Sequence, residues 1–308
     1  MKRPNIVVLM TDDQTLESMR VMPNVQRKPF FLNVAFIAPH GDITSKDKLA
    51  TPAPRHKGDF AGEPLPDSPN INEADVSDKP SHISDLPLLT EDELADAELR
   101  YQRRLESLLA VDEAVARIVG ELKRTGELAN TVILFVSDNG YLIGEHRLPE
   151  GKVLPYEESI RLPLIARGPG FAKGQTASAF AANIDLAPTI VDLARATARR
   201  TMDGISLVPV LEAPATTWSR DFVVESGPDP TSEDEGESDH AEMSFTGVRT
   251  ERYLYVEYTG TGERELYDLA TDPYELQNLD ADPAYDAIEA QLAARLDELR
   301  DCTGAACR

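Results

Sequence analysis

Polar residues that could bind a divalent cation follow two apolar stretches of the sequence. Asp12 and Asp13 come directly after the first stretch, and Asp138 and Asn139 come shortly after the second. Adjacent carboxylates repel each other unless a cation lies between them. Three carboxylates and one amide oxygen are hard ligands, which suit calcium or magnesium rather than zinc. We therefore expect a Ca²⁺ site at these four residues, with Mg²⁺ as an alternative occupant.

Each cluster also has a simpler explanation when it is taken alone. Asp12-Asp13 is typical of a helix N-cap, and Asp138-Asn139-Gly140 is typical of a turn. The metal site is favoured because both clusters come at the C-terminal end of a predicted strand. In an open α/β sheet those strand ends line the ligand crevice.

Two further residues are placed to act on an anion. His40 ends the apolar segment Phe30–Ile37 and could donate a proton or bind an anion, although an exposed loop histidine explains it equally well. Lys152 follows the Asp138 turn and could contact an oxyanion, but loop lysines are usually only solvated. Glu145 and His146 are weaker candidates, more typical of surface residues than of ligands.

The elements that must position these residues alternate between strands and helices. Apolar β-branched runs predict buried strands, and apolar residues at helical spacing predict helices. The predicted strands are Pro4–Met10, Phe30–Ile37, Thr131–Val136 and Leu162–Ala166, and the predicted helices are Thr90–Lys123 and Ile184–Ala194. This alternation predicts a doubly wound α/β sheet. Glu93, three residues after Thr90, predicts a capping box at the start of the long helix.

The chain is predicted to hold an α/β domain over residues 1–211 and a smaller α+β subdomain over 212–308. The subdomain should contain a hairpin of Phe245–Thr250 and Tyr253–Tyr258, and a last helix over roughly Pro283–Arg300.

Two other stretches are predicted to be loops. Gly41–Leu89 is rich in Pro, Asp, Ser and Lys without a sustained period, so we expect a long surface excursion. Asp229–Glu242 is acidic and Ser-rich, which is typical of a solvated loop.

Composition limits the partners. The formal net charge of -23 argues against a nucleic-acid partner, because a phosphate backbone would be repelled. A small anionic substrate remains compatible, since a bound cation dominates its own neighbourhood. The longest apolar runs are strand-sized, so no transmembrane segment is expected. The first ten residues lack the pattern of a signal peptide, and no feature indicates an oligomeric state.

The two cysteines lie close together near the C-terminal end. Cys302 and Cys307 are spaced for a local disulfide, which would indicate an oxidising compartment. Two reduced thiols on a frayed tail are the alternative.

The motifs together resemble the sulfatase family over nearly the whole chain. The matching segments are Pro4–Gln14, Ser137–Tyr141, Gly144–His146, Lys152–Glu157, Arg161–Leu164, Arg167–Gly170, Asn183–Thr189, Met202–Leu207, Glu265–Leu269, Asp272–Glu275 and Asn278-Leu279. Together with the paired cysteines, they look most like N-acetylglucosamine-6-sulfatase-like and actinobacterial arylsulfatase-like members.

The resemblance implies an alkaline-phosphatase-like fold and hydrolysis of sulfate esters at a calcium ion. It implies calcium ligands at the two acidic clusters, and contacts of His40 and Lys152 with the sulfate or the leaving group. An aryl sulfate or a 6-sulfated amino sugar would be the substrate. The family nucleophile is a formylglycine made from the cysteine of a Cys-x-Pro-Ser-Arg motif, and members are usually secreted, periplasmic or lysosomal.

The sequence departs from the family pattern at the nucleophile. Val25 and Gln26 join directly where the family has a long segment that holds the motif, and neither Cys302 nor Cys307 is followed by x-Pro-Ser-Arg. Two alternatives to a sulfatase therefore stay open. One is an inactive metal- or carbohydrate-binding remnant, and the other is a phosphoester hydrolase of the same superfamily.

Overall fold

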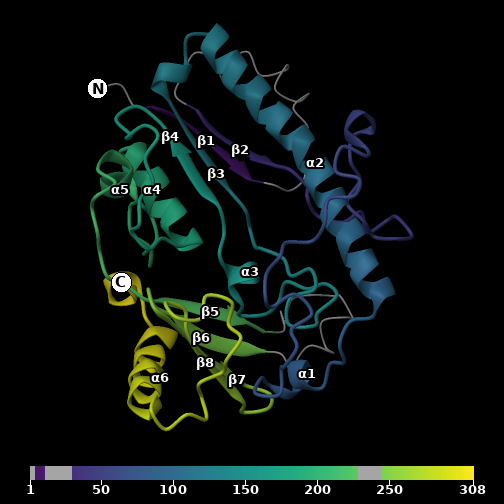
Figure 1. Ribbon diagram of the computed structural model, residues 1–308. Coiled ribbons are helices and arrows are strands. Elements are labelled where there is room, and N and C mark those ends of the chain that lie inside the picture. Colours follow the sequence, from purple (N-terminus) through teal and green to yellow (C-terminus); the bar gives the residue numbers. More distant parts are fainter. Residues whose placement is uncertain (1–3, 11–29, 228–243) are drawn as a thin grey trace. The chain divides into compact units, whose positions relative to one another are not determined.

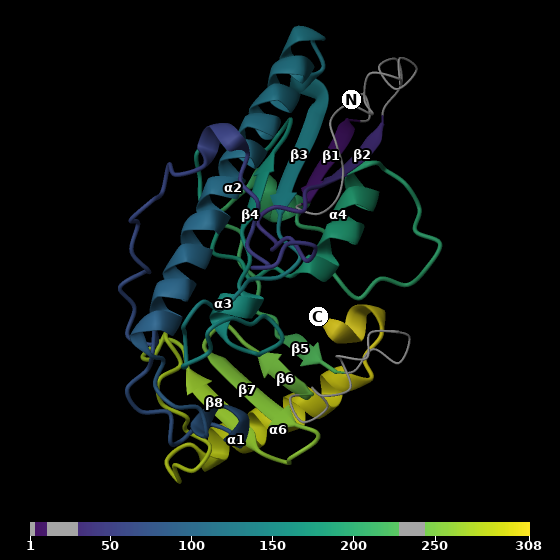
Figure 2. The ribbon, with the colours of Figure 1, turned by 90° about the vertical axis from the view of Figure 1, so that its right-hand side faces the viewer.

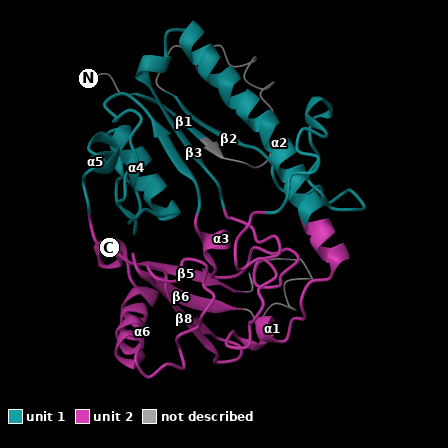
Figure 3. Ribbon diagram, in the orientation of Figure 1, with its two compact units in different colours: residues 1–65, 98–138, 162–217 teal, residues 66–97, 139–161, 218–308 magenta. Residues whose placement is uncertain are grey.

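A computed structural model describes residues 4–10, 30–227 and 244–308 (Figure 1). The chain divides into two compact units, each assembled from segments that are far apart in the sequence (Figure 3). Unit 1 comprises residues 1–65, 98–138 and 162–217, and unit 2 comprises 66–97, 139–161 and 218–308. Asp12, Asp13 and the acidic stretch 229–242 lie outside the described residues.

Unit 1 is built on a four-stranded sheet. Its strands are β1 (Asn5–Met10), β2 (Phe31–Ala35), β3 (Thr131–Val136) and β4 (Leu164–Arg167), in the order β2-β1-β3-β4. β1 pairs in parallel with both β2 and β3, and β4 joins β3 antiparallel. The predicted mostly parallel α/β sheet is confirmed.

Helices cover both faces of this sheet, and Figures 1 and 2 show them on opposite sides. Strand residues alternate between the faces, so Val7 and Ile133 pack against the helix α2 (Glu91–Arg124). Ile6, Val8, Val132 and Leu134 pack on the other face, against α4 and α5. These two helices span Leu186–Leu193 and Val208–Glu212. The result is a three-layer α/β/α arrangement.

The capping box at the start of α2 is confirmed. The Thr90 hydroxyl and backbone N–H both donate to Oε2 of Glu93 at 2.8 Å, and the Glu93 N–H donates back to the Thr90 hydroxyl at 3.3 Å. These bonds satisfy backbone donors that the first turn of a helix leaves open. Although α2 is long, no helix among the described residues is both long and apolar enough to span a membrane.

Unit 2 contains an antiparallel sheet in the order β5-β6-β7-β8. The strands are β5 (Phe222–Ser226), β6 (Phe245–Arg249), β7 (Tyr253–Tyr258) and β8 (Arg264–Asp268), and the helices are α1 (Ser81–Ser84), α3 (Glu157–Ile160) and α6 (Asp286–Arg300). The predicted β6–β7 hairpin and the terminal helix are confirmed. α6 packs Leu292 and Leu296 against Tyr255 on one face of the sheet. The other face is covered by residues from 66–97 and 139–161, including Val76, Ile83 and Tyr156.

Two predictions about burial were wrong. The later part of Gly41–Leu89 is not a surface excursion, because Asn70, Val76 and Ile83 are buried in unit 2. The strand predicted at Leu162–Ala166 begins at Leu164 and lies at the edge of its sheet, where Ile165 is 63% exposed. The first error arose because a polar composition does not reveal burial when long-range partners satisfy the polar groups.

Candidate functional site

The C-terminal ends of the three parallel strands lie on one rung of the sheet. Met10 of β1 is paired with Ala35 of β2 and also with Val136 of β3. The chain therefore leaves all three strands at the same edge, which is the edge that binds ligands in open α/β sheets. Asp138 comes two residues after Val136, and His40 comes five residues after Ala35. Asp12 and Asp13 follow Met10 outside the described residues.

Asp138 is exposed and Asn139 is half-buried. The Ser137 hydroxyl lies 3.4 Å from Oδ1 of Asp138, and the side-chain amide of Asn139 donates to the Gly140 carbonyl at 2.8 Å. This bond engages the amide nitrogen of Asn139 and not its side-chain oxygen.

Gly140 is required by a close approach of two backbones. A Cβ at Gly140 would lie 1.9 Å from the carbonyl oxygen of Glu158, so no larger residue fits. The Gly140 N–H donates to the Ser159 carbonyl, and the Tyr141 N–H donates to the Glu158 carbonyl, both at 2.8 Å. The segment after Asn139 is thus fixed against α3 by main-chain hydrogen bonds, which explains the glycine in the Ser-Asp-Asn-Gly motif.

His40 is exposed in a turn, and its backbone N–H donates to the Ile37 carbonyl at 2.8 Å. Nδ1 lies 2.8 Å from the Gly41 carbonyl. Since a carbonyl only accepts, Nδ1 carries the proton in this contact, and Nε2 is the nitrogen that could face a substrate. Arg104 of α2 donates to the Pro39 carbonyl at 3.2 Å and holds the same turn.

Lys152 lies in unit 2, in the loop before α3. It is half-buried, and its carbonyl accepts a hydrogen bond from the Ser159 hydroxyl. Its position relative to Asp138 and His40 of unit 1 stays a prediction.

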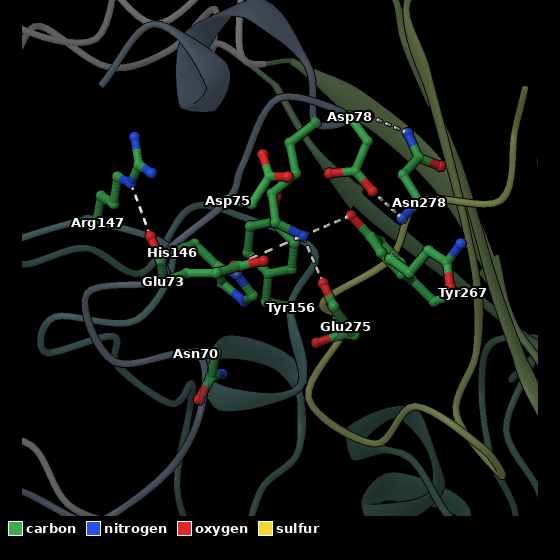
Figure 4. Close-up of polar contacts among 12 residues, drawn as sticks. Asn70, Glu73, Asp75, Asp78, His146, Arg147, Tyr156, Tyr267, Glu275 and Asn278 are labelled. Carbon is green, nitrogen blue, oxygen red and sulfur yellow. Dashed lines mark hydrogen bonds and ion pairs between the residues drawn. The ribbon is translucent and has the colours of Figure 1, made fainter. Parts of the chain in front are cut away.

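The interpretation of Glu145 and His146 as surface residues was wrong. His146 is 0% exposed and Glu145 is 8% exposed. Nδ1 of His146 lies 2.6 Å from Oε2 of Glu73, and the ring stacks on Tyr156 with centroids 4.0 Å apart (Figure 4). Burial, helped by the nearby Lys79 ammonium, lowers the pKa of His146 to about 4, so the imidazole is neutral at physiological pH. Burial also raises the pKa of the Glu73 carboxyl to about 7.

The backbone of this motif is held in an uncommon conformation. His146 and Arg147 have φ values of 51° and 63°, which side chains other than glycine rarely adopt. The His146 N–H donates to the Asn70 carbonyl at 2.8 Å, and the Arg147 guanidinium donates to carbonyls of residues 73, 74 and 86 at 2.7–2.8 Å. These bonds hold the turn that directs the imidazole into unit 2.

Sequence reasoning did not identify the partners of His146. Glu73 and Asn70 lie in the stretch that was predicted to be a surface loop, and no periodicity distinguishes them. Glu158 and Glu275 lie within or beside family-like motifs, which was the available signal, but those motifs do not reveal that these side chains meet His146.

The donor set at the sheet edge fits a calcium ion, because Asp138 and Asn139 offer carboxylate and amide oxygens. The formylglycine of the family does not fit. The chain has two cysteines, and Cys302 and Cys307 form a disulfide with a Cα–Cα distance of 5.2 Å. No cysteine is therefore left for conversion to formylglycine.

Comparison with known proteins identifies the family. Residues 4–196 match the sulfatase family, and residues 144–302 match the C-terminal region of N-sulphoglucosamine sulphohydrolase. Sulfatase ppz1 of Metarhizium majus is 35% identical over 91% of this chain and 62% of that protein. The N-acetylglucosamine-6-sulfatase of Homo sapiens is 32% identical over 91% of this chain and 53% of that protein. An arylsulfatase of Volvox carteri is 33% identical over 91% and 48%. The chain thus spans only 48–62% of the length of these relatives.

Two solved structures are similar to this chain. BT4656, in complex with its substrate D-glucosamine-2-N,6-O-disulfate, superposes with a TM-score of 0.74 at 26% identity, over 92% of this chain and 67% of that one. The phosphonate monoester hydrolase of Agrobacterium radiobacter superposes with a TM-score of 0.64 at 26% identity, over 92% and 59%. These neighbours confirm the predicted alkaline-phosphatase-like fold. The chain belongs to the sulfatase family.

Proposed function

We propose that this chain binds sulfate esters of amino sugars at a calcium site on the sheet edge, without turning them over by the covalent route of its family. The observation that carries this proposal is a contrast within the chain. The strand ends that lead to both acidic clusters share one rung, whereas both cysteines are joined in a disulfide.

Four residues would hold the cation: Asp12, Asp13, Asp138 and Asn139. Their oxygens match the preference of Ca²⁺, and Mg²⁺ could take the same place. When bound, the cation would polarise a sulfate oxygen. His40, through Nε2, would hold a proton beside the leaving oxygen, and Lys152 would contact a sulfate oxygen by its ammonium.

A sulfated amino sugar is the proposed ligand because two relatives act on such compounds. The human relative is named as an N-acetylglucosamine-6-sulfatase, and BT4656 is seen with a disulfated glucosamine. The disulfide favours an oxidising compartment for the chain, as in secreted or lysosomal sulfatases.

Two measurements on the purified protein test this proposal. Calorimetric titration with glucosamine-6-sulfate should give tighter binding in the presence of Ca²⁺ than in its absence. A chromogenic aryl sulfate should show no appreciable turnover, because removing a nucleophile normally lowers the rate by several orders of magnitude. A chromogenic phosphonate monoester serves as a parallel substrate for the phosphoester alternative.

Binding that ignores calcium would contradict the proposed site. Robust turnover of the aryl sulfate that Asp138→Ala abolishes would instead show that the chain holds another nucleophile.

A further inference from the structure

A second set of metal-ligating atoms lies buried within unit 2, and it shares no residue with the proposed calcium site. The His146 cluster consists of His146, Glu158 and Glu275, each of which has one ligand atom within 4.8 Å of the others. His146 and Glu275 are 0% exposed. Figure 4 shows His146 and Glu275 gathered with Glu73 and Tyr156.

Each member of the His146 cluster is anchored through one of its polar atoms. Nδ1 of His146 contacts Oε2 of Glu73 at 2.6 Å. Oε1 of Glu158 accepts from the side-chain amide of Asn70 at 2.7 Å, and Oε2 of Glu275 accepts from the backbone N–H of Glu157 at 2.9 Å. Since these contacts fix the rotamers, the cluster is held in place before any ligand arrives.

The opposite atoms of the same three side chains have no hydrogen-bond partner within the described part of the chain. They are Nε2 of His146, Oε2 of Glu158 and Oε1 of Glu275, all of them buried. Oδ1 of Asn70, the residue that anchors Glu158, is also buried and unpartnered among these residues. Buried polar atoms are nearly always paired, so such a group requires an explanation.

All of the unpartnered atoms are acceptors when the imidazole N–H donates to Glu73 and both Glu158 and Glu275 are ionised. Nε2 of His146 then carries a lone pair. With both carboxyls ionised, one water can donate only two hydrogens and would leave one of the three acceptors unpaired, and a proton shared by Glu158 and Glu275 would leave Nε2 unpaired. A cation satisfies all three at once.

The buried Lys79 ammonium does not take this role. Its nitrogen contacts the Tyr267 hydroxyl at 3.2 Å and the backbone carbonyl of Glu275, and it lies 3.8 Å from Oε2 of Glu73. Lys79 therefore makes an ion pair with the outer carboxylate, Glu73, and its hydrogen bonds go to Tyr267 and to the Glu275 carbonyl.

We propose that the His146 cluster binds a divalent transition-metal ion through Nε2 of His146, Oε2 of Glu158 and Oε1 of Glu275. One imidazole with two carboxylates is a zinc-type ligand set, whereas calcium takes oxygen ligands only. A histidine that binds a metal usually gives its other N–H to a carboxylate, as His146 does to Glu73. Asn70 could supply a fourth oxygen. The ion would join the stretch that holds His146 and Glu158 to Glu275, which is distant in the sequence, so its role would be structural.

Zinc itself is the probe for this proposal. The full chain is incubated with Zn²⁺ in excess Ca²⁺, which occupies the oxygen-only site, and unbound metal is removed by gel filtration. We expect about one zinc to be retained per chain, as structural sites hold one ion. At 100-fold excess over the dissociation constant, the melting temperature should rise by about 5 °C or more. Cobalt in place of zinc should give visible absorption bands typical of nitrogen and oxygen ligands.

His146→Ala and Glu158→Gln should lose the retained zinc. Glu158→Gln is a milder change, because its amide oxygen can still accept from Asn70, and it decides the test if His146→Ala does not fold. His82→Ala is the matched control, since His82 is a half-buried histidine of unit 2 whose Nε2 is buried and unpartnered among the described residues. His82→Ala and Asp138→Ala should both keep the zinc. No zinc on the unmodified chain, or equal retention by all variants, would overturn the proposal.

Discussion

Met10 and Val136 are partners in the parallel ladder between β1 and β3. The chain therefore leaves both strands at the same rung, and Asp12 and Asp138 each come two residues later. A shift of one residue in the pairing of β1 with β3 would bring different residues of the two strands to the same rung and reverse the faces of their side chains. The calcium site that we propose depends on this register more than on either acidic pair alone.

Removal of the Asp138 carboxylate should weaken calcium binding. A metal ligand matters at least as much as an outer-shell partner, whose loss typically lowers affinity roughly 10–100-fold. We expect Asp138→Ala to weaken Ca²⁺ binding by at least that factor, measured by calorimetric titration. Asp297→Ala is the control, because Asp297 has a side chain that is 76% exposed on α6. Equal affinities in the two variants would contradict the assignment.

Lys152 should matter for the sulfate rather than for the metal. We expect Lys152→Met to weaken the binding of glucosamine-6-sulfate while Ca²⁺ affinity stays unchanged, because an ammonium contributes charge to the anion only. Lys173→Met removes the same charge from an exposed loop lysine and serves as the control. If both lysine variants bind the sulfated sugar equally well, Lys152 has no role in the site.

The sequence was most informative where local patterns decide the structure. The apolar runs of β1 and β3 and the capping box at Thr90 depend on neighbours in the sequence, and all three were predicted correctly. The resemblance to sulfatases was also sufficient to identify the family. The acidic clusters were predicted to follow strand ends, but no sequence pattern gives the register in which β1 pairs with β3.

Burial of the polar residues in unit 2 could not be predicted in this way. Lys79 contacts the carbonyl of Glu275, which is 196 positions away, and His146 contacts Glu73, which is 73 positions away. A polar segment is buried when such distant partners satisfy it, and a single sequence does not reveal them. The edge position of β4 was missed for a different reason, since the apolar segment Leu162–Ala166 does not reveal that β4 has a neighbour on one side only.

The cysteine pair gives a prediction that is independent of the sites. Titration under denaturing, non-reducing conditions should find no free thiol, and two titratable thiols would contradict the bond between Cys302 and Cys307. The closed loop is short, so Cys302→Ser together with Cys307→Ser should lower the free energy of unfolding by only about 2 kcal/mol on the chain-entropy model. Chemical denaturation measures this difference.

Glu265 should be essential for the stability of unit 2. Its Oε1 accepts from the hydroxyls of Tyr156 and Tyr267 at 2.8 and 2.7 Å, and its Oε2 accepts from Tyr258 at 2.7 Å. An unpaired buried polar group costs about 1–3 kcal/mol, so Glu265→Ala should lower the free energy of unfolding by at least about 3 kcal/mol. Glu251→Ala, in the exposed turn between β6 and β7, should change it by no more than about 0.5 kcal/mol. Urea denaturation compares the two, and similar losses would refute the role of Glu265.

His82 should make the stability of the chain depend on pH. Its ring packs against Tyr258 with centroids 4.8 Å apart, and burial lowers the pKa of the imidazole below 6.5 despite the opposing charges of Glu265 and Glu263. The unfolded chain therefore binds a proton at a higher pH than the folded chain does. The contribution of His82 is present above about pH 6.5 and is lost as the pH falls below that value. In urea denaturation at about pH 7.5 and about pH 5.5, His82→Phe should lose less stability between the two than the unmodified chain. His40→Phe controls for the number of histidines, and an unchanged pH dependence in His82→Phe would contradict the prediction.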